Sequence, residues 1–116
     1  MRAGLLCTDD GLAEALFAAG ERTHERVWRL PLDEEYFELI RGDDSDIKNS
    51  GGRKAGSIIG GMFLKQFVTD ATPWAHVDMA GKMEVTELMA MEIPYRHIGG
   101  MGYGVRLFLD YLSLLE

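Results

Sequence analysis

The stretch AGSIIGGMFLKQFVTDATPWAHVDMAG, from Ala55 to Gly81, decides the fold because its apolar periodicity changes once along its length. Its first half carries apolar residues at helical spacing, which predicts an amphipathic helix. These residues are Ile58, Ile59, Met62, Phe63 and Phe67. Thr-Asp-Ala-Thr-Pro ends the helical pattern, and the second half then alternates polar and apolar residues, as a strand does. A helix followed directly by a strand favours an α/β protein.

Three glycines fall within the predicted helix, at Gly56, Gly60 and Gly61. Each glycine destabilises a helix interior by about 1 kcal/mol relative to alanine. We therefore expect a neighbouring strand or helix to pack closely against that side of the helix.

The residues before this stretch predict a strand and two helices. Ala3–Cys7 is a brief apolar run typical of a buried strand, and Thr8 is placed to cap a helix that Gly20 ends. After a polar link and the partly buried segment VWRLP, Asp33 is placed to cap a second helix with Gly42 as its stop.

The residues after it predict a loop and a final helix. The range 81–104 has little periodicity and is rich in glycine, which is typical of a loop. Apolar residues at helical spacing follow, at Val105, Phe108, Leu109 and Leu112. The order strand, three helices, strand, loop and helix predicts an α/β fold with about four helices and two or more short strands.

Composition limits the class of protein. The chain has 116 residues, 47% of them hydrophobic and 27% charged, which is typical of one globular domain at most. A net charge of −7 disfavours nucleic acid as a partner. No apolar run approaches the roughly 20 residues that cross a bilayer, and the N-terminus does not resemble a signal peptide. Cys7 is the single cysteine, so no internal disulfide forms, and we expect a cytoplasmic protein without a membrane partner.

His76 and Asp78 are the sharpest candidates for a metal site, because residues two apart on a strand share a face. A catalytic zinc ion usually takes three protein ligands, and neither His24 nor His97 stands at diagnostic spacing to supply the third. The alternative is structural: a satisfied histidine, and an aspartate that accepts backbone hydrogen bonds from the turn at Ala80 and Gly81. Both interpretations stay open on these residues alone.

Three blocks of the sequence, in their order and spacing, resemble the C-terminal part of the catalytic domain of the leucine aminopeptidase (cytosol aminopeptidase) family of metallopeptidases. The blocks are Glu25–Ile40, Asp46–Val68 and Pro73–Gly81. The segments AAGERTHERVW and GMGYGVRLFLDYL are similar to that family too. The resemblance implies that residues 1–116 are a single partial domain, a fragment of an α/β/α layered domain with a mixed sheet.

Members of this family remove N-terminal amino acids from peptides, with leucine preferred, and the resemblance implies the same substrates here. It also implies two divalent metal ions (zinc, manganese or magnesium), a bridging water that attacks the peptide carbonyl, and a homo-oligomer, the hexamer of the family. In DMAGKM, Ala80 and Met83 match positions that line the pocket for the substrate's first side chain, whereas Lys82 is less typical.

One family motif, Asn-Thr-Asp-Ala-Glu-Gly-Arg, is absent from the sequence. Because that motif carries metal ligands, the resemblance implies that this chain binds no metal, has no catalytic residues and is inactive alone. His76 and Asp78 match positions that support the strand and its turn. Two roles follow as alternatives: a segment that is active only with the missing upstream part of an aminopeptidase, or a non-catalytic remnant that acts as an oligomerisation or interaction module.

Overall fold

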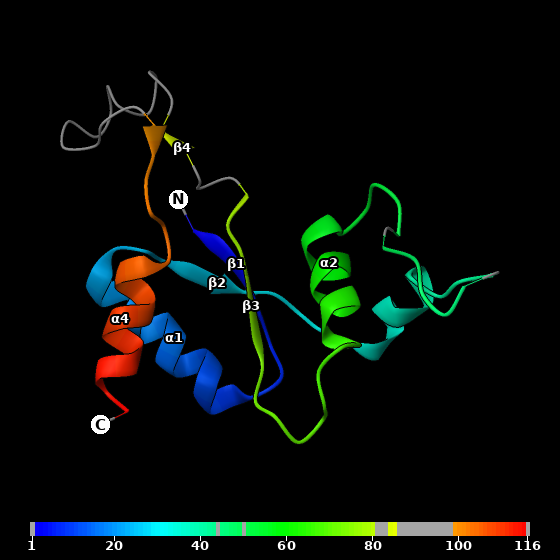
Figure 1. Ribbon diagram of the computed structural model, residues 1–116, viewed down its shortest axis with the longest axis horizontal. Coiled ribbons are helices and arrows are strands. Elements are labelled where there is room, and N and C mark those ends of the chain that lie inside the picture. Colours follow the sequence, from blue (N-terminus) through cyan, green and yellow to red (C-terminus); the bar gives the residue numbers. More distant parts are fainter. Residues whose placement is uncertain (1, 44, 50, 81–83, 86–98, 116) are drawn as a thin grey trace.

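A mixed three-stranded sheet forms the centre of the protein (Figure 1). The computed structural model describes residues 2–43, 45–49, 51–80, 84–85 and 99–115. Strand β1 (Ala3–Cys7) lies in the middle, parallel to β2 (Val27–Arg29) and antiparallel to β3 (Ala75–Asp78). The two predicted strands, β1 and β3, are confirmed as the central strand and one outer strand of this sheet. The sequence pattern did not predict β2 as a strand, because three residues are too few to show alternation.

Helices cover both faces of the sheet, as Figure 1 shows. On one face α1 (Asp10–Thr23) and α4 (Val105–Ser113) lie side by side, and on the other lies α2 (Gly56–Lys65). The side chains of β1 alternate between these layers: Leu5 is buried in the cluster with α1 and α4, whereas Leu6 points at α2. The predicted α/β architecture with helices on both faces of a mixed sheet is therefore confirmed.

Helix α1 begins and ends differently from the prediction. Its N-cap is Asp9, whose Oδ1 accepts a hydrogen bond from the N–H of Leu12 at 2.7 Å. The predicted cap, Thr8, is instead bonded to the backbone of Trp74. The helix continues through Gly20 and ends at His24, which adopts the left-handed conformation with φ of 60°. Gly20 allows close packing, since a Cβ there would lie 3.0 Å from the carbonyl oxygen of Glu25.

The close neighbour expected beside the glycines of α2 exists at one of them. A Cβ on Gly61 would lie 2.7 Å from Cδ2 of Leu6, so this glycine lets α2 approach β1. At Gly56 and Gly60 an added Cβ would meet no described atom within 4 Å. The prediction is thus confirmed at Gly61, whereas the described part of the chain offers no close neighbour at the other two.

The segment after β2 forms a 3-10 helix, η1 (Glu34–Leu39), in place of the α-helix expected there. It stops before Gly42, and Asp33 makes no side-chain cap hydrogen bond. Ile40, immediately after it, is fully buried against Ile59 and Met62 of α2. The η1 and α2 helices thus share a second apolar cluster, separate from the one between the sheet and α1.

The predicted loop over 81–104 contains two short strands, β4 (Glu84–Val85) and β5 (Gly99–Gly100), which pair in antiparallel fashion. The loop prediction is therefore wrong at those four residues. Helix α4 is confirmed, but its buried residue is Leu107. The four apolar residues used to predict it are all exposed, namely Val105, Phe108, Leu109 and Leu112.

A buried carboxylate from the link between α1 and β2 holds α4. Glu25 is 2% exposed, and its Oε2 accepts hydrogen bonds from the N–H groups of Gly104 at 3.0 Å and Leu107 at 2.9 Å. Its Oε1 accepts a bond from Nε of Arg106 at 3.0 Å. Since the N-cap residue of α4 is a glycine, Glu25 supplies the cap from a distant part of the chain. Among the described residues, none of the helices has the length and apolar character of a membrane span.

Candidate functional site

The carboxyl end of β3 brings Asp78 and Ala80 together. The Oδ1 of Asp78 accepts a hydrogen bond from the N–H of Ala80 at 3.2 Å, which closes the turn after the strand. This contact confirms the hydrogen bond predicted from Ala80, whereas Gly81, the other predicted donor, lies outside the described residues. Ala80 itself is exposed, so its methyl group stands at the surface beside the end of β3.

The first turn of α2 also acts on the Asp78 side chain. The Ser57 hydroxyl, in that turn, is the largest cause of the lowered pKa of Asp78, and the N–H of Ala80 lowers that pKa further. Partial burial opposes these effects, and the charge of His76 makes the smallest contribution to lowering the pKa. The carboxylate is therefore ionised at neutral pH, close to the positive end of the α2 dipole.

His76 shares a face of β3 with Asp78, as predicted, but among the described residues no third ligand joins them. Its ring lies nearly parallel to that of Trp74, with the ring centroids 6.3 Å apart. Within the described ranges, no three His, Cys, Asp or Glu side chains are grouped so that they hold a metal ion. His24 is the C-cap of α1, and His97 lies outside the described residues, as does Met83.

Ser57 is the member of this site that the sequence patterns did not single out. It follows a glycine-rich segment and opens a helix, and no local pattern connects it with the end of β3. The signal lay in tertiary packing: α2 rests on β1 and β3, and this contact brings the first turn of α2 to the end of β3.

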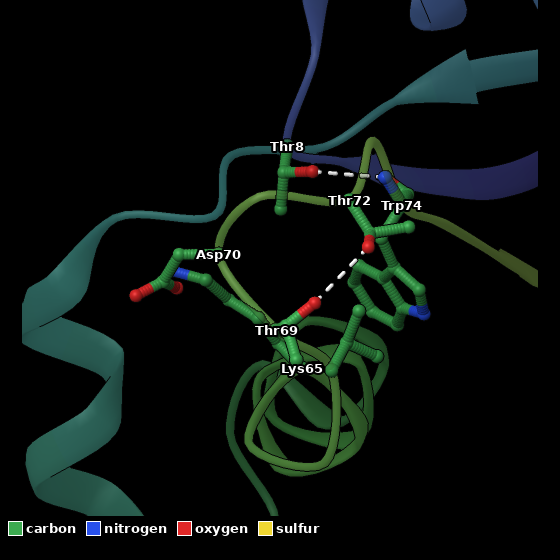
Figure 2. Close-up of a pocket in the computed structure, with 7 residues that line it drawn as sticks. Thr8, Lys65, Thr69, Asp70, Thr72 and Trp74 are labelled. Carbon is green, nitrogen blue, oxygen red and sulfur yellow. Dashed lines mark hydrogen bonds between the residues drawn. The ribbon is translucent and has the colours of Figure 1, made fainter.

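A cavity of about 200 Å³ lies at the opposite end of β3 (Figure 2). The Thr8 hydroxyl there accepts a hydrogen bond from the N–H of Trp74 at 3.0 Å, and the hydroxyls of Thr69 and Thr72 are 3.0 Å apart. Lys65 also lines the cavity, and its Nζ donates a hydrogen bond to Oε1 of Glu34, the first residue of η1, at 2.6 Å. Because these polar groups already bond one another or neighbouring elements, we assign this cavity a structural role.

Replacing Ser57 by alanine should raise the pKa of Asp78 toward its ordinary value, because the largest cause of the lowering is removed. A carboxylate with a lowered pKa stabilises the folded state above its unfolded-state pKa of about 3.9, and that contribution disappears as the pH falls through the lower folded-state value. The difference in stability between the two proteins should therefore be present at neutral pH and shrink in acid.

A carboxyl carbon NMR titration of Asp78 checks this expectation, with Thr69→Ala as a matched control that removes a hydroxyl at the other end of β3. An unchanged Asp78 midpoint in Ser57→Ala would contradict the assigned contact.

Comparison with known proteins places these residues among aminopeptidases. The sequence profile described as the cytosol aminopeptidase family, catalytic domain, matches residues 1–109. A probable cytosol aminopeptidase of Protochlamydia amoebophila is 46% identical over 113 residues, which are 97% of this chain and 22% of that protein. One from Sinorhizobium fredii is 50% identical over 113 residues, covering 95% of this chain and 21% of the relative. The chain thus spans about a fifth of the length of these relatives.

Solved structures agree with the sequence comparison. The cytosol aminopeptidase from Coxiella burnetii superposes with a TM-score of 0.83 at 34% identity, over 97% of this chain and 23% of that chain. The bottromycin maturation enzyme BotP, in complex with Mn, gives a TM-score of 0.88 at 34% identity, over 98% of this chain and 24% of that chain.

Proposed function

The chain belongs to the cytosol aminopeptidase family, and we propose that residues 1–116 form part of the catalytic domain of a metal-dependent aminopeptidase. The enzyme would remove N-terminal amino acids from peptides, with leucine preferred. The observation that carries the proposal is the match of the catalytic-domain profile to residues 1–109. The net charge of −7 and the single cysteine support a cytoplasmic protein that does not bind nucleic acid.

Within that function, we assign Ala80 and Met83 to the wall of the pocket for the substrate's N-terminal side chain. The position of Ala80 supports this assignment, because it is exposed directly after β3 and its backbone is fixed by Asp78. A methyl side chain leaves room for a branched apolar group such as that of leucine.

The metal ions of the reaction, whether zinc, manganese or magnesium, do not fit the residues described here. These residues offer no group of three ligands, and Asp78 is already engaged by Ser57 and Ala80. We therefore propose that residues elsewhere in the catalytic domain hold the ions, that this chain binds none, and that it hydrolyses no peptide alone.

Co-expression tests this proposal. Residues 1–116 are produced together with the part of the Sinorhizobium fredii relative that has no counterpart in this chain, and hydrolysis of leucine amide is measured with manganese present. We expect neither piece to hydrolyse the substrate alone and the pair to do so. Residues 1–116 lack the residues that hold the metal ions, and the other piece lacks the pocket wall at Ala80. Turnover by residues 1–116 alone would disprove their inactivity, and no turnover by the pair would contradict the aminopeptidase assignment.

A second candidate function, an oligomerisation or interaction module, is favoured by the outer face of α4. Val105, Phe108, Leu109 and Leu112 follow one another at helical spacing, and Leu109 is 64% and Leu112 54% exposed. An exposed apolar stripe of this kind is typical of a surface that another protein surface covers. The isolated chain is therefore expected to self-associate.

Replacing Leu109 and Leu112 by glutamate should convert the purified chain to a monomer, because the charges oppose burial of the α4 face. Analytical ultracentrifugation measures the change. The matched control is Leu64→Glu with Phe67→Glu, which adds the same charge to exposed apolar residues on and just after α2. A wild-type chain that sediments as a monomer would rule out the α4 face as a self-association surface.

A further inference from the structure

We propose that Asp78 is a positioning residue for substrate selection: it fixes the backbone at Ala80 and so sets the depth of the pocket for the substrate's N-terminal side chain. This inference rests on the proposed function, because it requires Ala80 to line that pocket. It goes beyond that function by naming what holds the pocket wall in place.

Asp78 stands where β3 leaves the sheet. In the three-stranded sheet β3 is an outer strand, and Asp78 is its last residue, paired with Gly4 of β1. Ala80 lies beyond this pairing, and the bond from its N–H to Asp78 Oδ1, at 3.2 Å, closes the turn. Loss of that bond removes a local constraint on the backbone that carries the Ala80 methyl group.

Ser57 links this turn to a rigid part of the fold. Its hydroxyl, in the first turn of α2, stabilises the ionised Asp78 carboxylate and lowers its pKa. Helix α2 is in turn held against β1 by the close approach of Gly61 to Leu6, and against Ile40 by Met62. The position of Ala80 therefore depends on the packing of α2 as well as on β3.

The chemistry requires an acceptor at residue 78 for the N–H of Ala80. Aspartate and asparagine both present a side-chain oxygen with two lone pairs, whereas alanine presents none. Asp78→Asn keeps the acceptor and removes the charge, whereas Asp78→Ala removes both. Comparing the two variants therefore separates the effect of the hydrogen bond from that of the negative charge.

Loss of Asp78 should change which substrate side chain the enzyme prefers. Each methylene group that an apolar pocket accommodates changes discrimination by roughly 10- to 200-fold. A displaced Ala80 should impair the fit of leucine more than that of alanine, because the smaller side chain does not reach the pocket wall. Loss of Asp78 should therefore reduce the preference for leucine by about tenfold, near the lower end of that range.

The co-expressed pair described above provides the test, with kcat and KM measured separately for leucine amide and alanine amide. In Asp78→Ala and, to a smaller extent, Ser57→Ala, we expect KM for leucine amide to rise while kcat and the values for alanine amide change little. Asp78→Asn should retain most of the leucine preference. The control is Asp70→Ala, which removes an exposed carboxylate at the other end of β3.

Equal losses for both amides in Asp78→Ala and Ser57→Ala, or an unchanged preference, would overturn the inference while leaving the aminopeptidase assignment intact. Ser57→Ala keeps the strand sequence unaltered, so it decides the matter if Asp78→Ala fails to fold. No turnover by the wild-type pair would instead contradict the proposed function itself, and the inference with it.

Discussion

Replacing Glu25 by alanine should lower the free energy of unfolding by about 2–6 kcal/mol, because two buried N–H groups lose their acceptor and each unsatisfied donor costs about 1–3 kcal/mol. The donors are the backbone N–H groups of Gly104 and Leu107, both within 3.0 Å of Glu25 Oε2. Gly104 has φ of 97° and no capping side chain of its own. Without Glu25 the first turn of α4 therefore has no cap.

Urea unfolding followed by circular dichroism measures this loss. The matched control is Glu21→Ala, which removes a half-exposed carboxylate paired with Arg2 and Arg26. Exposed pairs of this kind contribute about 0–1 kcal/mol. Glu25→Gln should be intermediate, since its amide oxygen still accepts a hydrogen bond but its charge is lost. A Glu25→Ala protein as stable as Glu21→Ala would show that this cap does not hold α4.

Replacing Leu6 by alanine should lower the free energy of unfolding by about 2–5 kcal/mol, the range for a fully buried leucine. Leu6 is fully buried between β1 and α2, and its Cδ2 would lie 2.7 Å from a Cβ on Gly61. Gly61→Ala should overpack this contact and lower the free energy of unfolding by about 1–3 kcal/mol. The gain of about 1 kcal/mol in helix propensity partly offsets that loss.

The two substitutions together should destabilise the protein less than the sum of the single effects. The alanine methyl group at residue 61 fills part of the space that Leu6 leaves, and residues in contact are typically coupled by about 0.5–3 kcal/mol. Gly60→Ala is the control on the same helix: no described atom lies within 4 Å of its added Cβ, so it should stabilise the protein by up to about 1 kcal/mol. Strictly additive effects of Leu6→Ala and Gly61→Ala would contradict the close packing of α2 on β1.

Local patterns were sufficient to predict β1, α2, β3 and α4, because the apolar run of β1 and the apolar periodicity of the other three lie within their own residues. They were insufficient where a distant residue decides the local structure. The cap of α4 comes from Glu25, far away in the sequence, and Asp9 replaced Thr8 as a cap because Thr8 is bonded to Trp74. The buried side of α4 was equally unpredictable, since it depends on how the helix packs against α1.

In the candidate site, too, local patterns predicted some contacts and missed those that depend on tertiary packing. The period of a strand predicted that His76 and Asp78 share a face, and turn chemistry predicted the bond from the N–H of Ala80 to Asp78. The contact with Ser57 requires α2 to be packed on the sheet, so no local pattern contains it. The assignment of Ala80 and Met83 to a substrate pocket came from the family resemblance and stays a prediction.

The most direct test of the central claim, that this chain contributes to the substrate side of an aminopeptidase and not to its metal centre, is the metal content of the purified 116-residue protein. The protein is prepared without chelators, incubated with zinc, manganese and magnesium, dialysed and examined by elemental analysis. We expect no stoichiometric ion. One or more ions per chain, lost on replacement of His76 by alanine, would show that the chain holds a metal centre of its own and would contradict the claim.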